Sequence, residues 1–289
     1  MSADPAPVET TVSPWAARRL RADELRARHP FAAEQLTLYL ALLPVQEDAW
    51  SRARDSPPGS EALPQWAAAA VLPAVVEATV AAGPAALGEA ARSRLAGGAA
   101  GDGLAVWLAG AELDPVDRYL ARACLGPVLE ALGEQAGAAC ARHRDGERSQ
   151  LCPCCGGLPQ VSCLASSGES LVSGPRSLLC ARCGASWSCS RSVCPACGES
   201  EEARLSVYAE RWDGPVSGNG NGNANGGTEP VFGHLRIAGC STCSRYLIEV
   251  DMAGDARAVP EVDEMAALPL DLYAADQGLR KLTPNLMGF

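Results

Sequence analysis

The sequence predicts an α+β protein: an amino-terminal all-α helical domain, two small rubredoxin-like or zinc-ribbon β modules, and a carboxy-terminal helix. Apolar residues recur at helical spacing in the first half, and few residues there favour strands. Short β-type runs and four C-x-x-C pairs occupy the second half. The expected divisions are a flexible tail at 1–12, a helical domain at 13–145, metal modules at 150–190 and 191–256, and a helix with a tail at 257–289.

The composition argues against several classes of protein. Hydrophobic residues make up 47% of the 289 residues, which is enough for a sizeable core. The formal net charge of −10 counts against a nucleic-acid-binding protein, because phosphate contacts need a basic surface. The Ala-rich run at 67–87 comes closest to a membrane span, but Pro73, Glu77 and Gly83 interrupt it, so we expect a buried helix pair and no membrane insertion. Without a signal-peptide core, the expected location is the cytoplasm.

Start and stop signals divide the amino-terminal half into helices. Ser13-Pro14 reads as an N-cap followed by proline at the first helical position, and His29-Pro30 would end this helix. Asp114-Pro115 repeats the same start signal. The later helices are expected at about 31–54, 64–81, 84–97, 103–112 and 115–142.

The second half is expected to form short strands. A polar linker at 144–150 leads into it, and an almost pure Asn/Gly run predicts a flexible loop at 217–228. A helix is expected at about 261–281, with the basic end Arg280-Lys281 matching the helix dipole. The strands are expected at Pro159–Leu164, Ser177–Leu179, Ala185–Ser188, Arg204–Ala209, Gly233–Ile237 and Tyr246–Val250.

The four C-x-x-C pairs carry the strongest functional signal. Two such turns bring four thiolates around one tetrahedral ion, and thirteen cysteines in a reducing compartment indicate metal rather than disulfides. Each C-x-x-C turn is called a knuckle below. The order knuckle, strand, turn, strand, knuckle favours one metal site from the first and second knuckles and another from the third and fourth, although a cross-braced arrangement also fits the spacing. Sulfur ligands alone do not choose between zinc and iron. The candidate metal ligands are Cys152, Cys155, Cys180, Cys183, Cys194, Cys197, Cys240 and Cys243.

The other cysteines are expected to pack rather than to bind. Cys124 and Cys140 belong to Ala-rich helical segments and read as small core residues. Cys154 lies between the two ligands of the first knuckle and would point away from the metal. Cys163 and Cys189 lie on expected strands near the sites, where packing is favoured over ligation.

The remaining polar residues reveal no catalytic or cofactor-binding site. The sequence contains no H-E-x-x-H, no phosphate-binding G-x-x-x-x-G-K-[ST] and no visible nucleophile–base set. Three isolated histidines are not assigned to metal. Arg182, Arg191 and Arg245 lie near the knuckles, where they read as solvated surface that partly neutralises the thiolates, with a docking patch as the functional alternative.

The order of these motifs resembles a known family. The chain reads Cys152-Pro-Cys-Cys-Gly-Gly-Leu-Pro, then Leu179-Cys-Ala-Arg-Cys-Gly-Ala-Ser-Trp, then Arg191-Ser-Val-Cys-Pro-Ala-Cys-Gly, then Cys240-Ser-Thr-Cys-Ser-Arg-Tyr-Leu. Together with the segment from Val262 to Asp271, these motifs resemble the formate dehydrogenase accessory proteins of the FdhE family. The resemblance covers roughly 15–289 and is most specific over 152–286.

The resemblance implies a function that the residues alone do not show. Proteins of that family are cytoplasmic maturation factors that bind the catalytic subunit of a molybdenum or tungsten formate dehydrogenase and are needed for its activity. Their cysteine pairs bind iron in a rubredoxin-like manner, so the resemblance implies two iron ions on the eight cysteines named above. This sequence departs from the pattern at Cys154, an extra thiol in the first knuckle, and in the Asn/Gly run before Cys240.

Three functions therefore compete at this point. The favoured one is a non-enzymatic assembly chaperone for a formate dehydrogenase catalytic subunit. The second is a redox or sulfur-handling protein in which the iron or a thiol such as Cys154 or Cys189 reacts. The third is a nucleic-acid-binding zinc-ribbon protein, against which the acidic charge counts. The sequence does not predict the oligomeric state or the surface that would bind a client.

Overall fold

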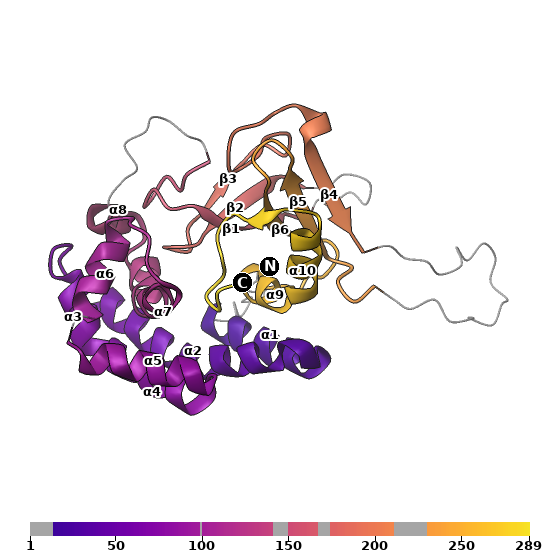
Figure 1. Ribbon diagram of the computed structural model, residues 1–289. Helices are drawn as coiled ribbons and strands as arrows, with labels where there is room; N and C mark the ends of the chain where they lie inside the picture. The colour runs from indigo at the N-terminus through magenta and orange to yellow at the C-terminus, as the bar shows by residue number, and fades with distance from the viewer. Residues whose placement is uncertain (1–13, 99, 141–149, 167–173, 211–229) are drawn as a thin grey trace, which may run out of the picture.

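The α+β class is confirmed by the computed structural model of the protein (Figure 1). Helices lie on one side of the molecule, a mixed β-sheet lies on the other, and two short carboxy-terminal helices lie between them. The structure describes residues 14–98, 100–140, 150–166, 174–210 and 230–289. The expected tail at 1–12, most of the linker at 144–150 and the Asn/Gly loop at 217–228 lie outside these residues. The domain limits stay a prediction.

The helical half begins and ends its helices close to the expected signals. Asp114 caps α7, since its Oδ1 accepts hydrogen bonds from the backbone N–H groups of Val116 (2.9 Å) and Asp117 (3.2 Å). His29-Pro30 ends α1 as expected. The elements are α1 (Pro14–Arg28), η1 (Pro30–Ala32), α2 (Ala33–Asp55), α3 (Leu63–Ala70), α4 (Leu72–Ala82), α5 (Ala85–Ala96), α6 (Ala100–Leu108), α7 (Pro115–Leu132), η2 (Gly133–Gln135) and α8 (Ala136–Ala139).

Two expected helices are shorter than predicted. The segment expected at 64–81 is divided at Val71 into α3 and α4, which meet at a bend of 46°. Pro73 lacks the N–H group that would continue the hydrogen bonding of α3, and its ring crowds the carbonyl four residues earlier, so the helix is interrupted and a new one begins at Leu72. The segment expected at 115–142 ends its main helix at Leu132, because Gly133 takes a left-handed backbone with φ of 54°.

The bent pair α3–α4 is part of the hydrophobic core. It contributes the fully buried Leu63, Ala67 and Val75, together with Leu72. Among the described residues, no single helix is both long and apolar enough to cross a membrane. The two helices of this pair meet that criterion only when taken together, on length and composition.

The second half of the chain forms one sheet rather than two separate ones. Each expected strand is present within three residues of its expected ends. In the described part of the chain the strand order is β3-β2-β1-β6-β5-β4, and β7 pairs with β6 beside this path. The strands are β1 (Pro159–Leu164), β2 (Arg176–Cys180), β3 (Ser186–Ser188), β4 (Leu205–Ala209), β5 (Leu235–Cys240), β6 (Arg245–Asp251) and β7 (Arg280–Lys281).

Strands β1 to β3 form the first ribbon and strands β4 to β6 form the second, and the parallel pair β1–β6 joins the two. Val161 lies opposite Ile248, and Ser162 lies opposite Glu249. Pairing within each ribbon is antiparallel. Because β1 follows the first knuckle and β6 follows the fourth, their parallel alignment places all four knuckles at the same end of the sheet. The sequence predicted the ribbons but not this placement.

The carboxy-terminal segment covers one face of the sheet, but it is not a single helix to residue 281. It forms α9 (Pro260–Ala266) and α10 (Leu268–Asp276), and Arg280-Lys281 forms a strand, so the explanation of this basic pair by a helix dipole was wrong. The side chain of Lys281, the only lysine, is buried and pairs with Asp271 (Nζ–Oδ2 2.9 Å) and with Glu264. This buried ion cluster joins α9 and α10 to the sheet edge.

The first ribbon shares its core with the helical half. One continuous cluster of buried side chains contains helix residues such as Trp107, Cys124 and Leu129 together with all four cysteines of the first two knuckles. A second cluster fills the space between the sheet and α10, and a third joins α1 and α2 to α9 through Val262 and Met265. The helical half and the sheet are therefore packed as one body.

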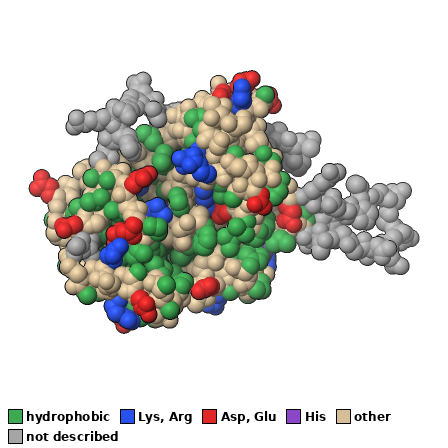
Figure 2. Space-filling model, viewed as in Figure 1, with side chains coloured by type: hydrophobic (Ala, Val, Ile, Leu, Met, Phe, Trp, Pro, Cys, Tyr) green, Lys and Arg blue, Asp and Glu red, His purple; other side chains and the backbone are tan. Residues whose placement is uncertain are grey.

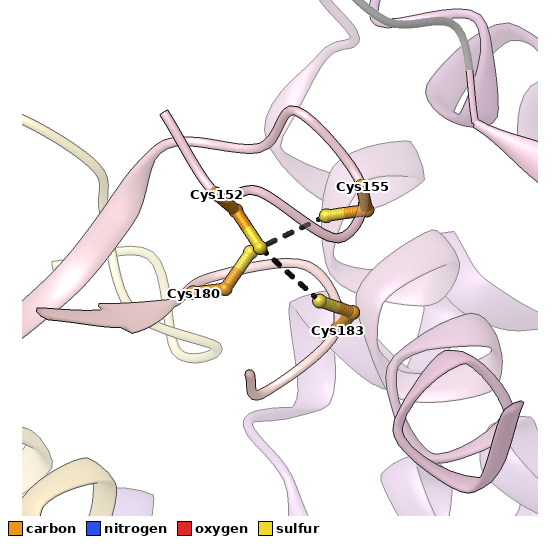
Figure 3. Close-up of side chains that lie close together, drawn as sticks. All are labelled: Cys152, Cys155, Cys180 and Cys183. Atoms are coloured by element: carbon orange, nitrogen blue, oxygen red, sulfur yellow. Dashed lines mark hydrogen bonds between the residues drawn. The ribbon is translucent and has the colours of Figure 1, made fainter. Parts of the chain in front are cut away.

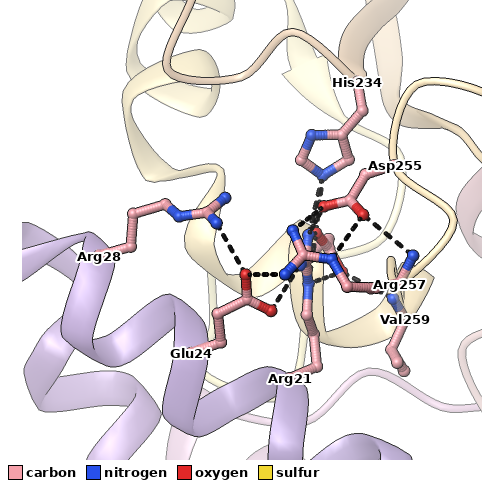
Figure 4. Close-up of polar contacts among 8 residues, drawn as sticks. Arg21, Glu24, Arg28, His234, Asp255, Arg257 and Val259 are labelled. Atoms are coloured by element: carbon pink, nitrogen blue, oxygen red, sulfur yellow. Dashed lines mark hydrogen bonds and ion pairs between the residues drawn. The ribbon is translucent and has the colours of Figure 1, made fainter.

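A buried ion network fixes α1 against the carboxy-terminal segment (Figure 4). The Arg21 side chain is 1% exposed, and its Nε donates to both carboxylate oxygens of Asp263 at 3.0 and 3.1 Å. Its Nη2 also pairs with Asp255 at 3.0 Å, while His234 contacts Asp263 at 2.7 Å. Burial alone would lower the pKa of Arg21, but hydrogen bonds and charge from Asp263 raise it, so the guanidinium stays charged.

The network predicts a large stability effect at Arg21. Arg21→Met would leave the buried carboxylate of Asp263 without its guanidinium partner, and removal of one partner of a buried pair costs about 3–5 kcal/mol. Urea denaturation would measure this loss. The matched control is Arg26→Met on the same helix, because the Arg26–Asp23 pair is exposed and contributes less than about 1 kcal/mol. Equal losses for the two variants would contradict this account.

Candidate metal centres

The first two knuckles bring four sulfur atoms together (Figure 3). The Sγ atoms of Cys152 and Cys183 are 3.7 Å apart, and those of Cys155 and Cys180 are 3.4 Å apart. All four sulfurs lie within 4.8 Å of one another, and all four side chains are buried. The first pair of the sequence therefore meets the second pair, as the order of the motifs favoured.

The third and fourth knuckles form an equivalent group. The Sγ atoms of Cys194 and Cys243 are 3.8 Å apart, as are those of Cys197 and Cys240. These four sulfurs also lie within 4.8 Å of one another, but Cys197 is exposed and Cys243 is half-buried. The second group is therefore open to solvent on one side, unlike the first. The cross-braced alternative does not occur.

The spacing of the sulfurs fits a tetrahedral metal ion. A four-thiolate site with metal–sulfur bonds of about 2.3 Å has its sulfurs about 3.8 Å apart at the corners of a tetrahedron. The separations of 3.4–3.8 Å given above are close to this value, and the other sulfur pairs of each group lie within 4.8 Å. Each group could therefore hold one metal ion.

The thiols of the first group are strongly coupled to one another. Hydrogen bonds from the neighbouring thiols, above all Cys155, lower the pKa of Cys152. The same close packing raises the pKa of Cys180 and Cys183, chiefly through their contacts with Cys152. Four crowded sulfurs cannot all ionise together, but a metal cation would neutralise their charge and stabilise the four thiolates.

The knuckle turns follow directly from the sequence around each pair. A left-handed residue follows the second cysteine in every knuckle, with φ between 53° and 80°. In three of them that residue is glycine, which adopts this conformation at little cost. In the fourth it is Ser244, at φ of 53°, which the sequence did not reveal as an equivalent position. The backbone N–H groups of Arg182 and Ala196 also donate to the sulfurs of Cys180 (3.3 Å) and Cys194 (3.4 Å).

Most of the spare cysteines are structural, and one lies at the first group. Cys124 is fully buried as expected. Cys154 donates to the carbonyl of Gly133 at 2.8 Å and does not join the four sulfurs. Cys140, expected to be a simple core residue, is buried against the first group, where its hydrogen bond with Cys155 lowers its pKa. The sequence contained no signal for this contact, because residue 140 lies outside every knuckle motif.

The surroundings of the other spare thiols do not activate them, although Cys154, Cys163 and Cys189 are only half-buried. Burial raises the pKa of Cys163 to about 12, and it also raises the pKa of Cys154 and Cys189. A reactive cysteine needs the opposite shift, because the thiolate is the nucleophile. Cys154 and Cys189 were the residues on which a thiol-based function would depend, so their environment does not favour that hypothesis.

Two of the three knuckle arginines differ from the expectation of solvated surface. Arg182 is half-buried and extends into the helical half, where its guanidinium lies 5.2 Å from the Trp107 ring centroid and donates to the Trp107 carbonyl at 3.3 Å. Arg245 is half-buried, whereas Arg191 is exposed. Arg182 thus joins the second knuckle to the helical core and was not identified as a structural contact from the sequence.

The histidines take no part in either group. His29 and His234 are buried near Phe232 and the Arg21 network, and His234 precedes β5 at the end of that strand away from its knuckle. His143 lies outside the described residues. Burial lowers the pKa of His29, which keeps it neutral. Neither described histidine contributes to a group of metal-binding atoms.

Known proteins resemble this chain in sequence and in fold. No family model matches it. A protein FdhE homolog of Aquifex aeolicus (strain VF5) is 29% identical over 138 residues, which are 48% of this chain and 41% of that protein. A protein FdhE homolog of Pseudomonas putida is 29% identical over 136 residues, 47% of this chain and 37% of that protein. The matches thus cover about two fifths of the length of these curated relatives.

The crystal structure of the FdhE protein from Pseudomonas aeruginosa extends the likeness to the whole described architecture. It aligns with a TM-score of 0.64 and 23% identity over 96% of this chain and 96% of that chain. At this identity the alignment shows a common fold. The matches in sequence and the shared fold together confirm that this chain resembles the FdhE family.

Proposed function

We propose that this chain is a cytoplasmic accessory protein that binds the catalytic subunit of a molybdenum or tungsten formate dehydrogenase and supports its assembly. The observation that carries the proposal is the pair of four-cysteine groups held by one sheet, in a chain that resembles FdhE proteins. Four protein ligands would close each metal site and leave no position for a substrate, which favours a binding protein over an enzyme.

We further propose that all eight cysteines of the two groups are metal ligands, with one ion in each group. The family resemblance favours iron, and the sulfur geometry equally accepts zinc. An iron ion in such a site can exchange one electron, whereas zinc has no redox chemistry. In either case the ligands are held by the knuckle turns, and the first ion would be enclosed by the helical core.

A hollow between the helical half and the carboxy-terminal segment is the proposed surface for the client. Hydrophobic side chains gather in this hollow (Figure 2). Its cavity of about 230 Å³ lies between α2, α5 and α7 on one side and residues 285–289 on the other. Phe289 lines it and is 45% exposed, so an apolar side chain is available for contact.

The metal content is the first test of this proposal. Protein purified without oxygen should contain about two metal ions per chain, since each closed group has four ligands. Elemental analysis would count them, and visible absorption after gentle oxidation would identify ferric four-thiolate sites. Two zinc ions without colour would leave the ligand assignment intact and remove any redox role. Protein that contains neither iron nor zinc after purification without oxygen would contradict the proposal.

Substitution of single ligands should separate the two sites. Cys183→Ser should lose the ion of the first group, and Cys243→Ser should lose that of the second, because three thiolates no longer close a tetrahedron. Cys183→Ser should also lower the thermal midpoint more, since its group belongs to the helical core. Cys189→Ser, outside both groups, is the matched control. Retention of both ions in either ligand variant would overturn the assignment.

Client binding can be tested at the hollow independently of the metal. Phe289→Asp should reduce co-purification of the formate dehydrogenase catalytic subunit at least about tenfold, because it places a charge in an apolar contact. Leu20→Asp is the matched control, since Leu20 is also exposed, at 68%, but lies outside the hollow. Unchanged capture by Phe289→Asp would exclude this surface, and loss of capture by both variants would argue against a specific one.

A further inference from the structure

A pocket between the two ribbons has the composition of a ligand site. Its volume is about 140 Å³, and it lies between the loop before Cys194, strands β4 to β6 and the side chain of Arg176 from β2. We infer that this junction pocket binds a carboxylate carried on a small apolar group. The inference does not rest on the proposed function, because it concerns the chemistry of the ligand whatever its source.

Arg176 brings a buried hydrogen-bond donor without a partner to this pocket. Its side chain is 4% exposed. Its Nε donates to Ser162 Oγ at 2.8 Å, and its Nη1 donates to the carbonyls of Ser190 (3.4 Å) and Val193 (3.2 Å). Its Nη2 is buried and has no hydrogen-bond partner. Buried polar groups are nearly always satisfied, so an unpartnered guanidinium donor beside a cavity indicates a missing acceptor.

Two more arginines line the same pocket. The Arg191 side chain makes no hydrogen bond or ion pair with any residue in the described ranges, and the Arg245 side chain makes one long hydrogen bond, to the carbonyl of Lys281 at 3.4 Å. The acidic residue of the described lining is Glu249, whose Oε2 is 3.6 Å from Arg176 Nε and also accepts from Ser162 Oγ. Three arginines against one glutamate give a lining charge of +2 in a chain of net charge −10.

The chemistry of the walls favours a carboxylate over other anions. Arginine forks bind the two oxygens of a carboxylate in a planar arrangement. The rest of the lining is largely apolar and includes Val193, Leu205 and Leu247, so a purely inorganic ion would leave these walls without contact. The carboxylate of Glu249 would also repel a dianion such as phosphate more strongly than it repels a monoanion. Butyrate, with one carboxylate and three further carbons, is therefore a suitable probe.

Another role for the arginines is to neutralise the second group of thiolates. Arg191 precedes Cys194 by three residues, and Arg245 follows Cys243 by two. This role predicts loss of metal when either arginine is replaced, whereas a ligand site predicts loss of butyrate binding with both metal ions retained. The two accounts are thus distinguished by metal analysis of the same variants.

Calorimetric titration of the metal-loaded full chain with sodium butyrate at constant ionic strength tests the inference. We expect saturable binding with a Kd on the order of a millimolar, no binding of butyramide, and weaker binding of phosphate. Arg191→Gln and Arg245→Gln should each weaken butyrate binding at least about tenfold. Arg92→Gln, an exposed arginine on α5, should bind as the unchanged protein does. Arg176 is left unchanged, because its side chain also holds the backbone carbonyls of Ser190 and Val193, and its loss would disturb the loop before Cys194.

The source of the carboxylate is resolved by a second probe. A short blocked peptide with a single glutamate that competes with butyrate and binds more tightly would identify an acidic side chain of a protein partner. A peptide that does not compete would identify a free small carboxylate. The inference is overturned if butyrate does not bind, if butyramide or phosphate binds as tightly as butyrate, or if the arginine variants bind butyrate as tightly as the unchanged protein does. Loss of metal in those variants would overturn it as well.

Discussion

The parallel pairing of β1 with β6 is the constraint on which the rest of the structure depends. Each ribbon alone would be a small antiparallel unit with exposed edges, and pairing in parallel joins them into one twisted sheet. The same pairing places Ser162 opposite Glu249, which positions the carboxylate that accompanies Arg176. It also creates the face on which α9 and α10 pack, and through α9 the sheet is linked to α1.

The helical half and the first group of four cysteines share one hydrophobic core, so neither is packed independently of the other. The cysteines of the first two knuckles belong to the same buried cluster as the side chains of α7, and Arg182 extends from the second knuckle to Trp107. The second group lies at the other ribbon, away from this core, and is partly exposed. The two groups are therefore similar in geometry but differ in their surroundings. A substitution in the first group disturbs the helical core, whereas a substitution in the second does not.

The sequence predicted those features that depend on local spacing. The grouping of the eight cysteines follows from the knuckle motifs and the strands between them, and the Asp114 cap follows from one dipeptide. Contacts between distant residues left no such signal. Arg21 and Asp263 are 242 residues apart, and the contact of Cys140 with Cys155 crosses from helix to knuckle. The division at Val71 depended on whether Pro73, which removes one helical hydrogen bond, would bend the helix or end it, and composition alone does not determine this.

The difference in enclosure between the two groups has a consequence for biosynthesis. An ion bound by the second group could reach Cys197 from solvent after the chain has folded, because this cysteine is exposed. The first group is surrounded by the helical core on completion of the fold, so an ion bound there would have to be acquired while that core is still open. Loading would then proceed in a fixed order, with the first ion captured during folding and the second exchangeable for the lifetime of the protein.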